Sequence, residues 1–397
     1  MLDTVRMKIT LREETGEVYE QEIIEDIYTN IKKMENCTEV NFKNEDIREI
    51  ILTFSFPKYY SKTNAYLIKT REECIQAQIY FTTTILVSLA FKASKYGFSS
   101  VPKLIDWLRD HITVKIIRVD TPFTYLKEES EEFNSYRNIF QFLALVYKKV
   151  NKKSGIKSIH TYLDETIETL TLADNSNVNS ANKKISIYNQ NKKIKDCYGK
   201  KGNEFLENIE KEFPDLKNRI RIEASKRINR KEMNFIEFLG FDIYKEYVNE
   251  FLEYILENTL DKKMLEIVKE ESIKKLAQEL SIERSKNGFR IKDFILKHKE
   301  KILSFDVLRK AIMKTSLKEN SGYILVTKAR KIIEELEKEK GIIYMDVEKK
   351  IQNIRERILE YQEDYKKDTE ADKISKQNYE VETRRTKRTR SKLFKNF

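Results

Sequence analysis

The chain has 397 residues, with 76 Lys and Arg against 65 Asp and Glu, a net charge of +11 and a hydrophobic fraction of 40%. It contains 9 Gly, 4 Pro, 3 Cys and 3 His. These counts exclude a disordered chain, a collagen-like repeat and a disulfide framework. The three His lie too far apart in sequence for a paired-His or Cys/His zinc site, so a metal would need carboxylate ligands.

Residues 1–240 mix strand and helix signals. Alternating, β-branched segments predict strands, and Pro57 and Pro122 are expected to end two of them. The expected strands are Leu2–Leu11, Glu49–Phe56, Ile112–Phe123, Thr166–Leu172, Lys184–Asn189 and Arg219–Lys226. The expected helices are Glu72–Lys95, Val101–Asp110, Glu132–Lys149 and Phe205–Phe213. This order favours an α+β fold with an antiparallel sheet over regular βαβ repeats.

Beyond residue 240 the apolar residues follow helical periodicity with few breakers. Helices are expected at residues 243–258, 261–280, 291–303, 305–316, 325–340 and 347–367. We therefore predict three parts: an α+β domain over 1–240, a helical DNA-binding or oligomerisation domain over 241–367, and a basic disordered tail over 368–397. The longest uncharged run, residues 74–91, is shorter than the ~20 apolar residues that span a bilayer, and no signal peptide is recognisable. A cytoplasmic protein without a membrane partner is expected.

The positive charge is concentrated in two segments. Residues 183–232 hold 15 Lys and Arg against 8 Asp and Glu, and residues 384–397 hold seven Lys and Arg with no acid. Such clustering is typical of proteins that bind polyanions.

Three expected strands each carry one polar face. Alternation places Arg118 with Asp120, Ser186 with Tyr188, and Arg221 with Glu223. If these strands pair in one sheet, their carboxylates can hold a hard divalent cation, and the tyrosine hydroxyl can attack a phosphodiester. An ordinary solvated sheet face would show the same alternation.

A family resemblance favours the chemical interpretation. The segments Ile116–Phe123 (IIRVDTPF), Lys184–Lys192 (KISIYNQNK) and Arg219–Arg227 (RIRIEASKR) resemble three successive blocks of the rolling-circle replication initiators. The most similar type is the filamentous-phage gene II/X group, which is related to plasmid replication-initiation factors. The opening Met1–Val5 also resembles the start of that family. Gln190 stands where the family usually has Lys, and the basic pair after Glu223 is slightly displaced.

The resemblance implies a Rep-like nicking domain in which Tyr188 is the nucleophile. Asp120 and Glu223 would hold Mg²⁺ or Mn²⁺, and Glu168 on a neighbouring strand is a further metal-ligand candidate. The side chains expected to bind DNA phosphates are Arg118, Lys192, Lys193, Arg221 and Arg227. Secondary candidates are His160, as a ligand or general base, and Tyr198, as another attacking tyrosine.

The implied activity is the nicking of origin DNA, which leaves a 5′-phosphotyrosine and a free 3′-hydroxyl. Single- and double-stranded origin DNA are then the expected partners, together with a host helicase and polymerase, and the protein could act as an oligomer. Two alternatives remain open. A conjugative or mobilisation relaxase would use the same chemistry. A noncatalytic DNA-binding or scaffold protein derived from such an initiator would not nick DNA.

Overall fold

The computed structural model describes residues 2–12, 18–43, 46–129, 131, 133–150, 155–163, 168–229, 232–299, 301–315, 319–339 and 346–367. Its strands are β1 (Thr4–Leu11), β2 (Cys37–Lys43), β3 (Asp46–Ser55), β4 (Ile112–Leu126), β5 (Ser158–Leu163), β6 (Glu168–Ala173), β7 (Lys183–Asn189), β8 (Arg219–Arg227) and β9 (Met233–Asn234).

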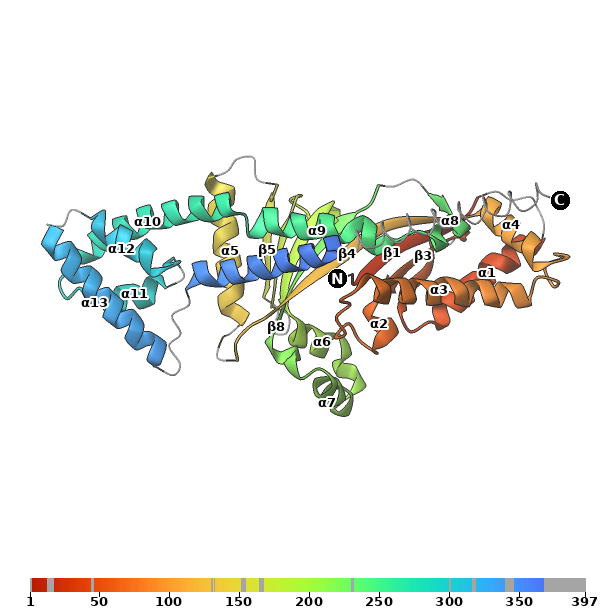
Figure 1. Cartoon of the computed structure of the whole chain (residues 1–397), viewed down its shortest axis with the longest axis horizontal. Helices are drawn as coiled ribbons and strands as arrows, with labels where there is room; N and C mark the ends of the chain where they lie inside the picture. The colour runs from red at the N-terminus through yellow and green to blue at the C-terminus, as the bar shows by residue number, and fades with distance from the viewer. Residues whose placement is uncertain are drawn as a thin grey trace, which may run out of the picture.

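Helices occupy most of the remaining described chain. They are α1 (Val18–Lys33), α2 (Pro57–Tyr60), α3 (Arg71–Phe91), α4 (Val101–His111), α5 (Phe133–Val150), α6 (Gln190–Tyr198), α7 (Asn203–Glu212), α8 (Phe235–Leu239), α9 (Ile243–Thr259), α10 (Lys262–Arg284), α11 (Ile291–His298), α12 (Phe305–Met313) and α13 (Glu319–Lys338). A further helix covers residues 347–367. The molecule is elongated, with α10–α13 at one end and α3 and α4 at the other (Figure 1).

All strands of the described residues belong to one antiparallel, nine-stranded sheet with the order β2-β3-β1-β4-β8-β7-β6-β5, and β9 also pairs with β4. The predicted α+β class is therefore confirmed at the level of an antiparallel sheet with many helices. The sheet is larger than the six strands expected, because β2, β5 and β9 lack a distinctive alternation. The first four strands follow a βαββαβ path through α1 and α3.

One face of this sheet is apolar and covered by helices. In β1, Val5, Met7 and Ile9 are buried, whereas Arg6 and Lys8 point to the opposite face. Helix α9 contacts β4 and β8, α5 contacts β5–β7, and α1 contacts β2 and β3. Because side chains alternate along each strand, the polar residues gather on the other face.

Strand β4 runs through Pro122, which was expected to end it. The pairing of β1 with β4 stops at Asp120, so beyond that point β4 has a partner only in β8. Proline has no N–H to donate, and it is tolerated where one side of a strand has no neighbour. The longer strand extends the sheet to Leu126.

The helical part is packed on the sheet part. One apolar cluster includes residues from Leu2 to Tyr365, and α9 lies directly on the sheet. The Lys350 ammonium pairs with Glu131 at 2.7 Å, joining the 347–367 helix to the residues before α5. The domain boundary at residue 240 stays a prediction, and the basic tail of residues 368–397 lies outside the described residues.

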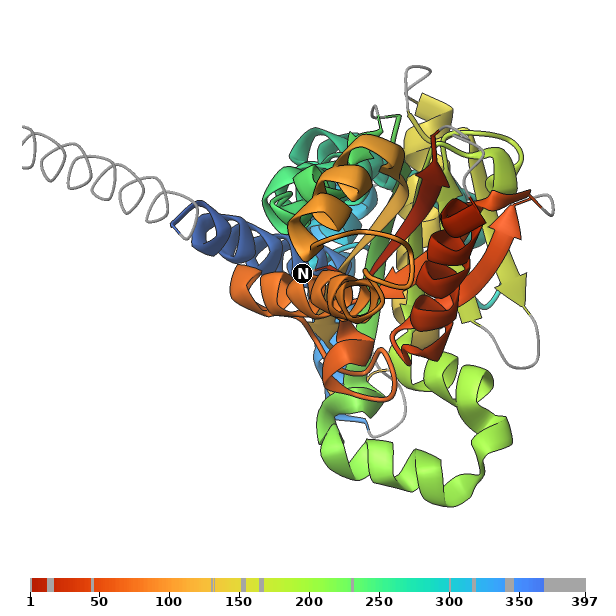
Figure 2. The same ribbon diagram turned by 90° about the vertical axis from the view of Figure 1, so that its right-hand side faces the viewer.

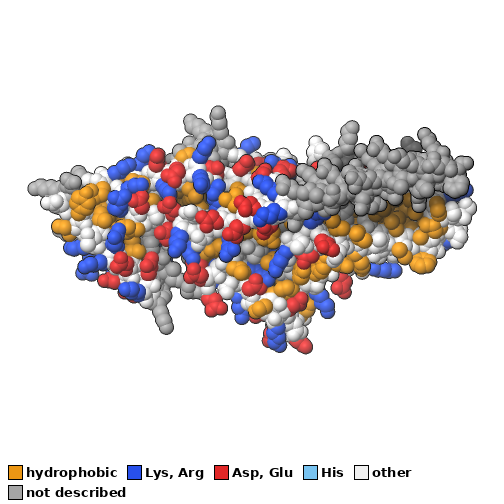
Figure 3. All heavy atoms as spheres, in the orientation of Figure 1, with side chains coloured by type: hydrophobic (Ala, Val, Ile, Leu, Met, Phe, Trp, Pro, Cys, Tyr) orange, Lys and Arg blue, Asp and Glu red, His pale blue; other side chains and the backbone are white. Residues whose placement is uncertain are grey.

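Helix α3 begins with a complete capping box, in which the Thr70 hydroxyl accepts from Glu73 N–H and Glu73 accepts from Thr70 N–H. Among the described helices it alone has the length and apolar composition needed to cross a membrane. Val87 and Phe91 on α3 are 52% and 86% exposed. Figure 3 shows hydrophobic side chains gathered over this end of the molecule.

Candidate functional site

The three strands predicted to carry the chemistry are neighbours in the order β4-β8-β7. Across them, Asp120 lies opposite Ser225, which lies opposite Lys184. One row further along, Glu223 lies opposite Ser186, and in the row after that Tyr188 lies opposite Arg221. The expected convergence of Asp120, Tyr188 and Glu223 on one face is therefore observed.

Tyr188 and Glu223 form the centre of the site. The Tyr188 hydroxyl donates a hydrogen bond to Glu223 Oε2 at 2.8 Å, and Tyr188 is 6% exposed. Burial, with the Glu223 charge next, raises the pKa of Tyr188 well above its usual value. Burial also raises the pKa of Glu223 to about 7, and the carboxylates of Asp120 and Asp3 add to that shift. The glutamate can therefore gain and lose a proton near neutral pH.

Arg221 and Asp3 form a buried ion pair beneath this centre. Arg221 Nη2 lies 2.8 Å from Asp3 Oδ2, with the two side chains 1% and 5% exposed. Arg221 Nε lies 3.8 Å from Glu223 Oε2, and Nη1 donates to the Asn64 carbonyl at 3.3 Å. Burial alone would lower the pKa of Arg221, but Asp3, Tyr188 and Glu223 raise it. Arg221 was expected to contact DNA; the structure places it in the interior, where it supports the two site residues.

A second charged group surrounds Asp120. The Thr4 hydroxyl donates to Asp120 Oδ2 at 2.6 Å. Lys184 lies within electrostatic range of Asp120 and Glu223, and also of Arg118 and Lys193. Burial and then Arg118 lower the pKa of the Lys184 ammonium. Acidic and basic side chains thus share a small, partly desolvated area.

The donor set fits a hard divalent cation in its chemistry. Asp3, Asp120 and Glu223 offer carboxylate oxygens, and among the described residues Asp3 Oδ1 is buried without a hydrogen-bond partner. The crowding of these carboxylates, which raises the pKa of Glu223, is what a dipositive ion would relieve. Over the described ranges, however, no three His, Cys, Asp or Glu side chains lie close enough to share one ion.

The predicted phosphate-binding lysines lie next to Tyr188 in the chain. Asn189 ends β7 and caps α6, because its side chain accepts from Lys192 N–H at 3.1 Å. Lys192 and Lys193 therefore occupy the first turn of a helix whose N-terminus is next to the tyrosine. Arg227 lies opposite Arg118 across β4 and β8 and donates to the Asn179 carbonyl at 2.6 Å.

The secondary candidates lie at different distances from the site. His160 shares a row with Glu223 but lies three strands away, about 14 Å at the usual strand spacing. Glu168 begins β6, and its side chain lies outside the described residues. Tyr198 is near enough for the charge of Asp3 to act on it, and burial raises its pKa to about 12. It is therefore the second tyrosine of this neighbourhood.

The sequence interpretation did not include Asp3 or Lys184 among the site residues. Lys184 has the same strand parity as Ser186 and Tyr188, so alternation alone could have revealed it. Asp3 reaches the site because its N–H donates to the Asp120 carbonyl at 3.0 Å, extending the β1–β4 pairing. No local pattern indicates that contact, although Asp3 lies in the opening stretch that resembles the family.

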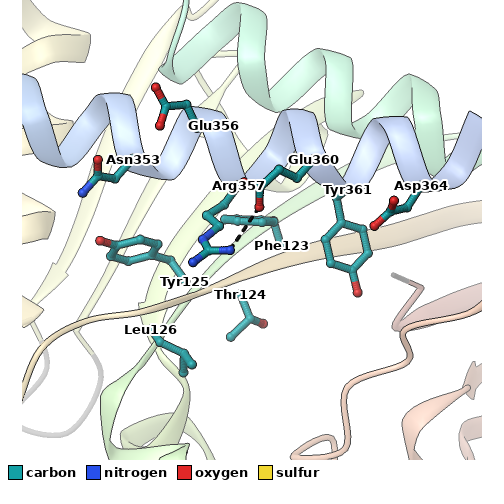
Figure 4. A pocket seen from close by; sticks show the side chains of 10 residues that line it. All are labelled: Phe123, Thr124, Tyr125, Leu126, Asn353, Glu356, Arg357, Glu360, Tyr361 and Asp364. Atoms are coloured by element: carbon teal, nitrogen blue, oxygen red, sulfur yellow. Dashed lines mark hydrogen bonds and ion pairs between the residues drawn. The ribbon is translucent and has the colours of Figure 1, made fainter.

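A separate hollow of about 790 Å³ lies between the end of β4 and the 347–367 helix (Figure 4). Its lining combines Phe123 and Tyr125 with acidic residues, and Arg357 pairs with Glu360 at 3.0 Å. Phe123 and Tyr125 alternate with Asp120 and Thr124 along β4, so their side chains lie on the opposite face of the sheet from Asp120. We therefore place the candidate site on the sheet and not in this hollow.

Comparison with protein-family models, with curated proteins and with solved structures finds no match for the chain.

Proposed function

We propose that the protein is a DNA-nicking initiator of rolling-circle replication with Tyr188 as the nucleophile. The observation that carries the proposal is the 2.8 Å hydrogen bond from Tyr188 to Glu223 on a face shared with Asp120. The resemblance of the three strand segments to initiator blocks supports the same assignment.

The chemistry requires that the phenol lose its proton as it attacks. Tyr188 Oη would form a bond to phosphorus, the bond from phosphorus to the 3′-oxygen would break, and the phenolic proton would pass to Glu223. Glu223 Oε2 already accepts the hydrogen bond from the Tyr188 hydroxyl, so it is the carboxylate oxygen placed to receive that proton. The departing 3′-oxygen takes a proton from solvent and becomes the primer terminus.

The phosphate charge needs cationic neighbours, which Arg118, Lys184 and Lys193 can supply. Arg118 and Lys193 are both close enough to Lys184 to influence it electrostatically. A divalent ion bound by Asp120 and Glu223, with Asp3 behind them, would supply Lewis-acid stabilisation of the phosphate oxygens.

Covalent capture tests the proposal directly. The full chain is incubated with a random-sequence library of single-stranded DNA and with supercoiled plasmid, each with Mg²⁺ or Mn²⁺. Protein that keeps DNA after denaturation is digested, and the modified peptide is identified by mass spectrometry. We expect an adduct on Tyr188, and none in the Tyr188→Phe variant, because phenylalanine has no oxygen to attack with.

The matched control is Tyr198→Phe, which changes the other tyrosine of this neighbourhood. It should retain the Tyr188 adduct. An adduct on Tyr198 that survives in Tyr188→Phe would show that the nucleophile is assigned wrongly.

A noncatalytic DNA-binding protein is the second candidate. The observations that favour it are the low exposure of Tyr188 and the lack of three converging ligands within the described residues. DNA binding without any covalent product, in either metal and with both substrates, would select this alternative.

A further inference from the structure

A surface rich in tyrosine and lysine borders the site. It consists of Lys58 and Tyr59 on α2, Tyr80 on α3, and Tyr198 with Lys201 after β7. We call these five residues the tyrosine–lysine surface. Figure 1 shows α2 beside α6, so segments more than a hundred residues apart in sequence meet here.

Aromatic rings are unusually accessible on this surface. Tyr59 and Tyr80 are 38% and 41% exposed, and their ring centroids lie 5.0 Å apart at 43°. Lys58 lies 5.8 Å and Lys201 5.3 Å from the Tyr198 ring centroid, within cation–π range. Exposed tyrosine rings with lysines nearby offer stacking for bases and positive charge for their phosphates.

The charge of the two segments is one-sided. Residues 57–71 contain four Lys and Arg and no Asp or Glu, and residues 189–202 contain five Lys and one Asp. Such a surface attracts phosphates, and tyrosine rings add base stacking without sequence preference.

The surface is joined to the site through Asn64. The Asn64 carbonyl accepts from Gln190 Nε2 at 2.7 Å and from Arg221 Nη1 at 3.3 Å. Gln190 is two residues after Tyr188, and Arg221 lies opposite Tyr188 on β8. The 57–66 segment, which carries Lys58 and Tyr59, is therefore held against the residues at the end of β7. In Figure 2 the orange α2 lies close to the green helices α6 and α7.

We propose that the tyrosine–lysine surface binds single-stranded DNA and leads it to Tyr188. The proposal rests on the proposed function for its choice of DNA as the substrate, and it names the form of DNA that the site takes. Unpaired bases stack on Tyr59 and Tyr80, while Lys58 and Lys201 contact the phosphates. Duplex DNA stacks its bases internally and cannot use the tyrosine rings.

Binding is measured in the Tyr188→Phe background, so that no cleavage interferes and the result does not depend on nicking. The probe is a fluorescent 30-nucleotide mixed-sequence single strand, read by anisotropy, with its own duplex beside it. Adding Tyr59→Ala and Tyr80→Ala together should weaken single-strand binding at least fivefold, because each stacked base contributes substantially to affinity. Duplex binding should change less than twofold.

Adding Lys58→Gln should instead lower the slope of log affinity against log salt by about 0.7, the loss of one single-strand phosphate contact. Matched controls are Tyr323→Ala and Lys103→Gln, exposed residues on α13 and α4. Thermal unfolding checks that each variant is folded. A 5-iodouracil strand, cross-linked to the Tyr188→Phe chain by light, should label Tyr59, Tyr80 or Tyr198.

The outcomes separate the two proposals. Unchanged single-strand binding in the tyrosine variant, or cross-links confined to other parts of the chain, contradicts the proposed role of the tyrosine–lysine surface even if the protein nicks DNA. Weakened binding in the tyrosine variant, together with no covalent product from the parent chain, supports the role of the tyrosine–lysine surface in binding and contradicts the proposed nicking activity. An RNA strand that binds more tightly than DNA of the same sequence overturns the choice of DNA.

Discussion

Two regions of the molecule gather charged side chains, and they balance those charges in opposite ways. In the helical part, His298 lies between Glu279 and Glu283, with ring nitrogens 3.2 and 3.3 Å from their carboxylates. Lys301 pairs with Glu279 at 2.7 Å, and Lys297 pairs with Glu283. Each acid there has a base beside it.

The polar face around Tyr188 is not balanced in this way. Asp3, Asp120 and Glu223 share Arg221 and Lys184, and the mutual repulsion contributes to the raised pKa of Glu223. By contrast, hydrogen bonds from Lys297 lower the pKa of Glu283. Keeping like charges close together lowers the stability of the folded protein at this face. That is typical of a functional site, whereas a structural ion network pairs each charge with an opposite one.

The largest expected effect comes from removing the central cation. Arg221→Met should lower the free energy of unfolding by about 3–5 kcal/mol, because it leaves buried carboxylates without a partner. Urea unfolding would measure the loss. Arg309→Met, at an exposed pair with Asp306, is the control and should cost less than about 1 kcal/mol. Equal losses in the two variants would show that the buried pair has no special role.

Glu223→Gln should act in the opposite direction. The folded pKa of Glu223 lies above its ordinary value of 4.5, so its stabilising contribution is complete below pH 4.5 and is lost as pH rises through about 7. Glutamine stays neutral and does not suffer that loss. Metal-free unfolding curves should show the variant about 1–3 kcal/mol more stable at pH 8, with the gain disappearing towards pH 4.5.

The same variant should lose the covalent DNA adduct, because glutamine cannot accept the Tyr188 proton. A variant that is both less stable at pH 8 and fully active would contradict the functional interpretation of the crowded acids.

Glu283→Gln is expected to have the smallest effect and the reverse pH dependence. Its lowered pKa means that its contribution is present above about pH 4.5 and is lost as pH falls below that value. The variant should therefore be less stable than the parent at pH 7 by under about 1 kcal/mol, and equal to it at low pH. If Glu283→Gln and Glu223→Gln changed stability in the same direction at pH 8, the contrast between the two regions would be wrong.

Much of the secondary structure was predictable because the periodicity was strong. The β8 segment alternates strictly, and the helices beyond residue 240 have continuous apolar stripes. The predictions of this strand and of these helices are therefore confirmed. Helix α6 was missed because Gln190 and Ile194 are its buried residues and it has no apolar stripe. Strand β4 was predicted too short because Pro122 normally ends a strand, and only the end of the β1 pairing makes it acceptable here.

Strand parity determined which side chains of this protein share a face, since alternate residues of any strand point the same way. That rule placed Tyr188, Asp120 and Glu223 on polar faces from the sequence alone. It could not predict that β8 lies between β4 and β7, or that Asp3, just before β1, forms an ion pair with Arg221. Those contacts join residues distant in sequence, and the packing of the whole sheet decides them. Tertiary structure likewise decided that Arg221 is interior, because burial depends on every neighbouring element and not on residue type.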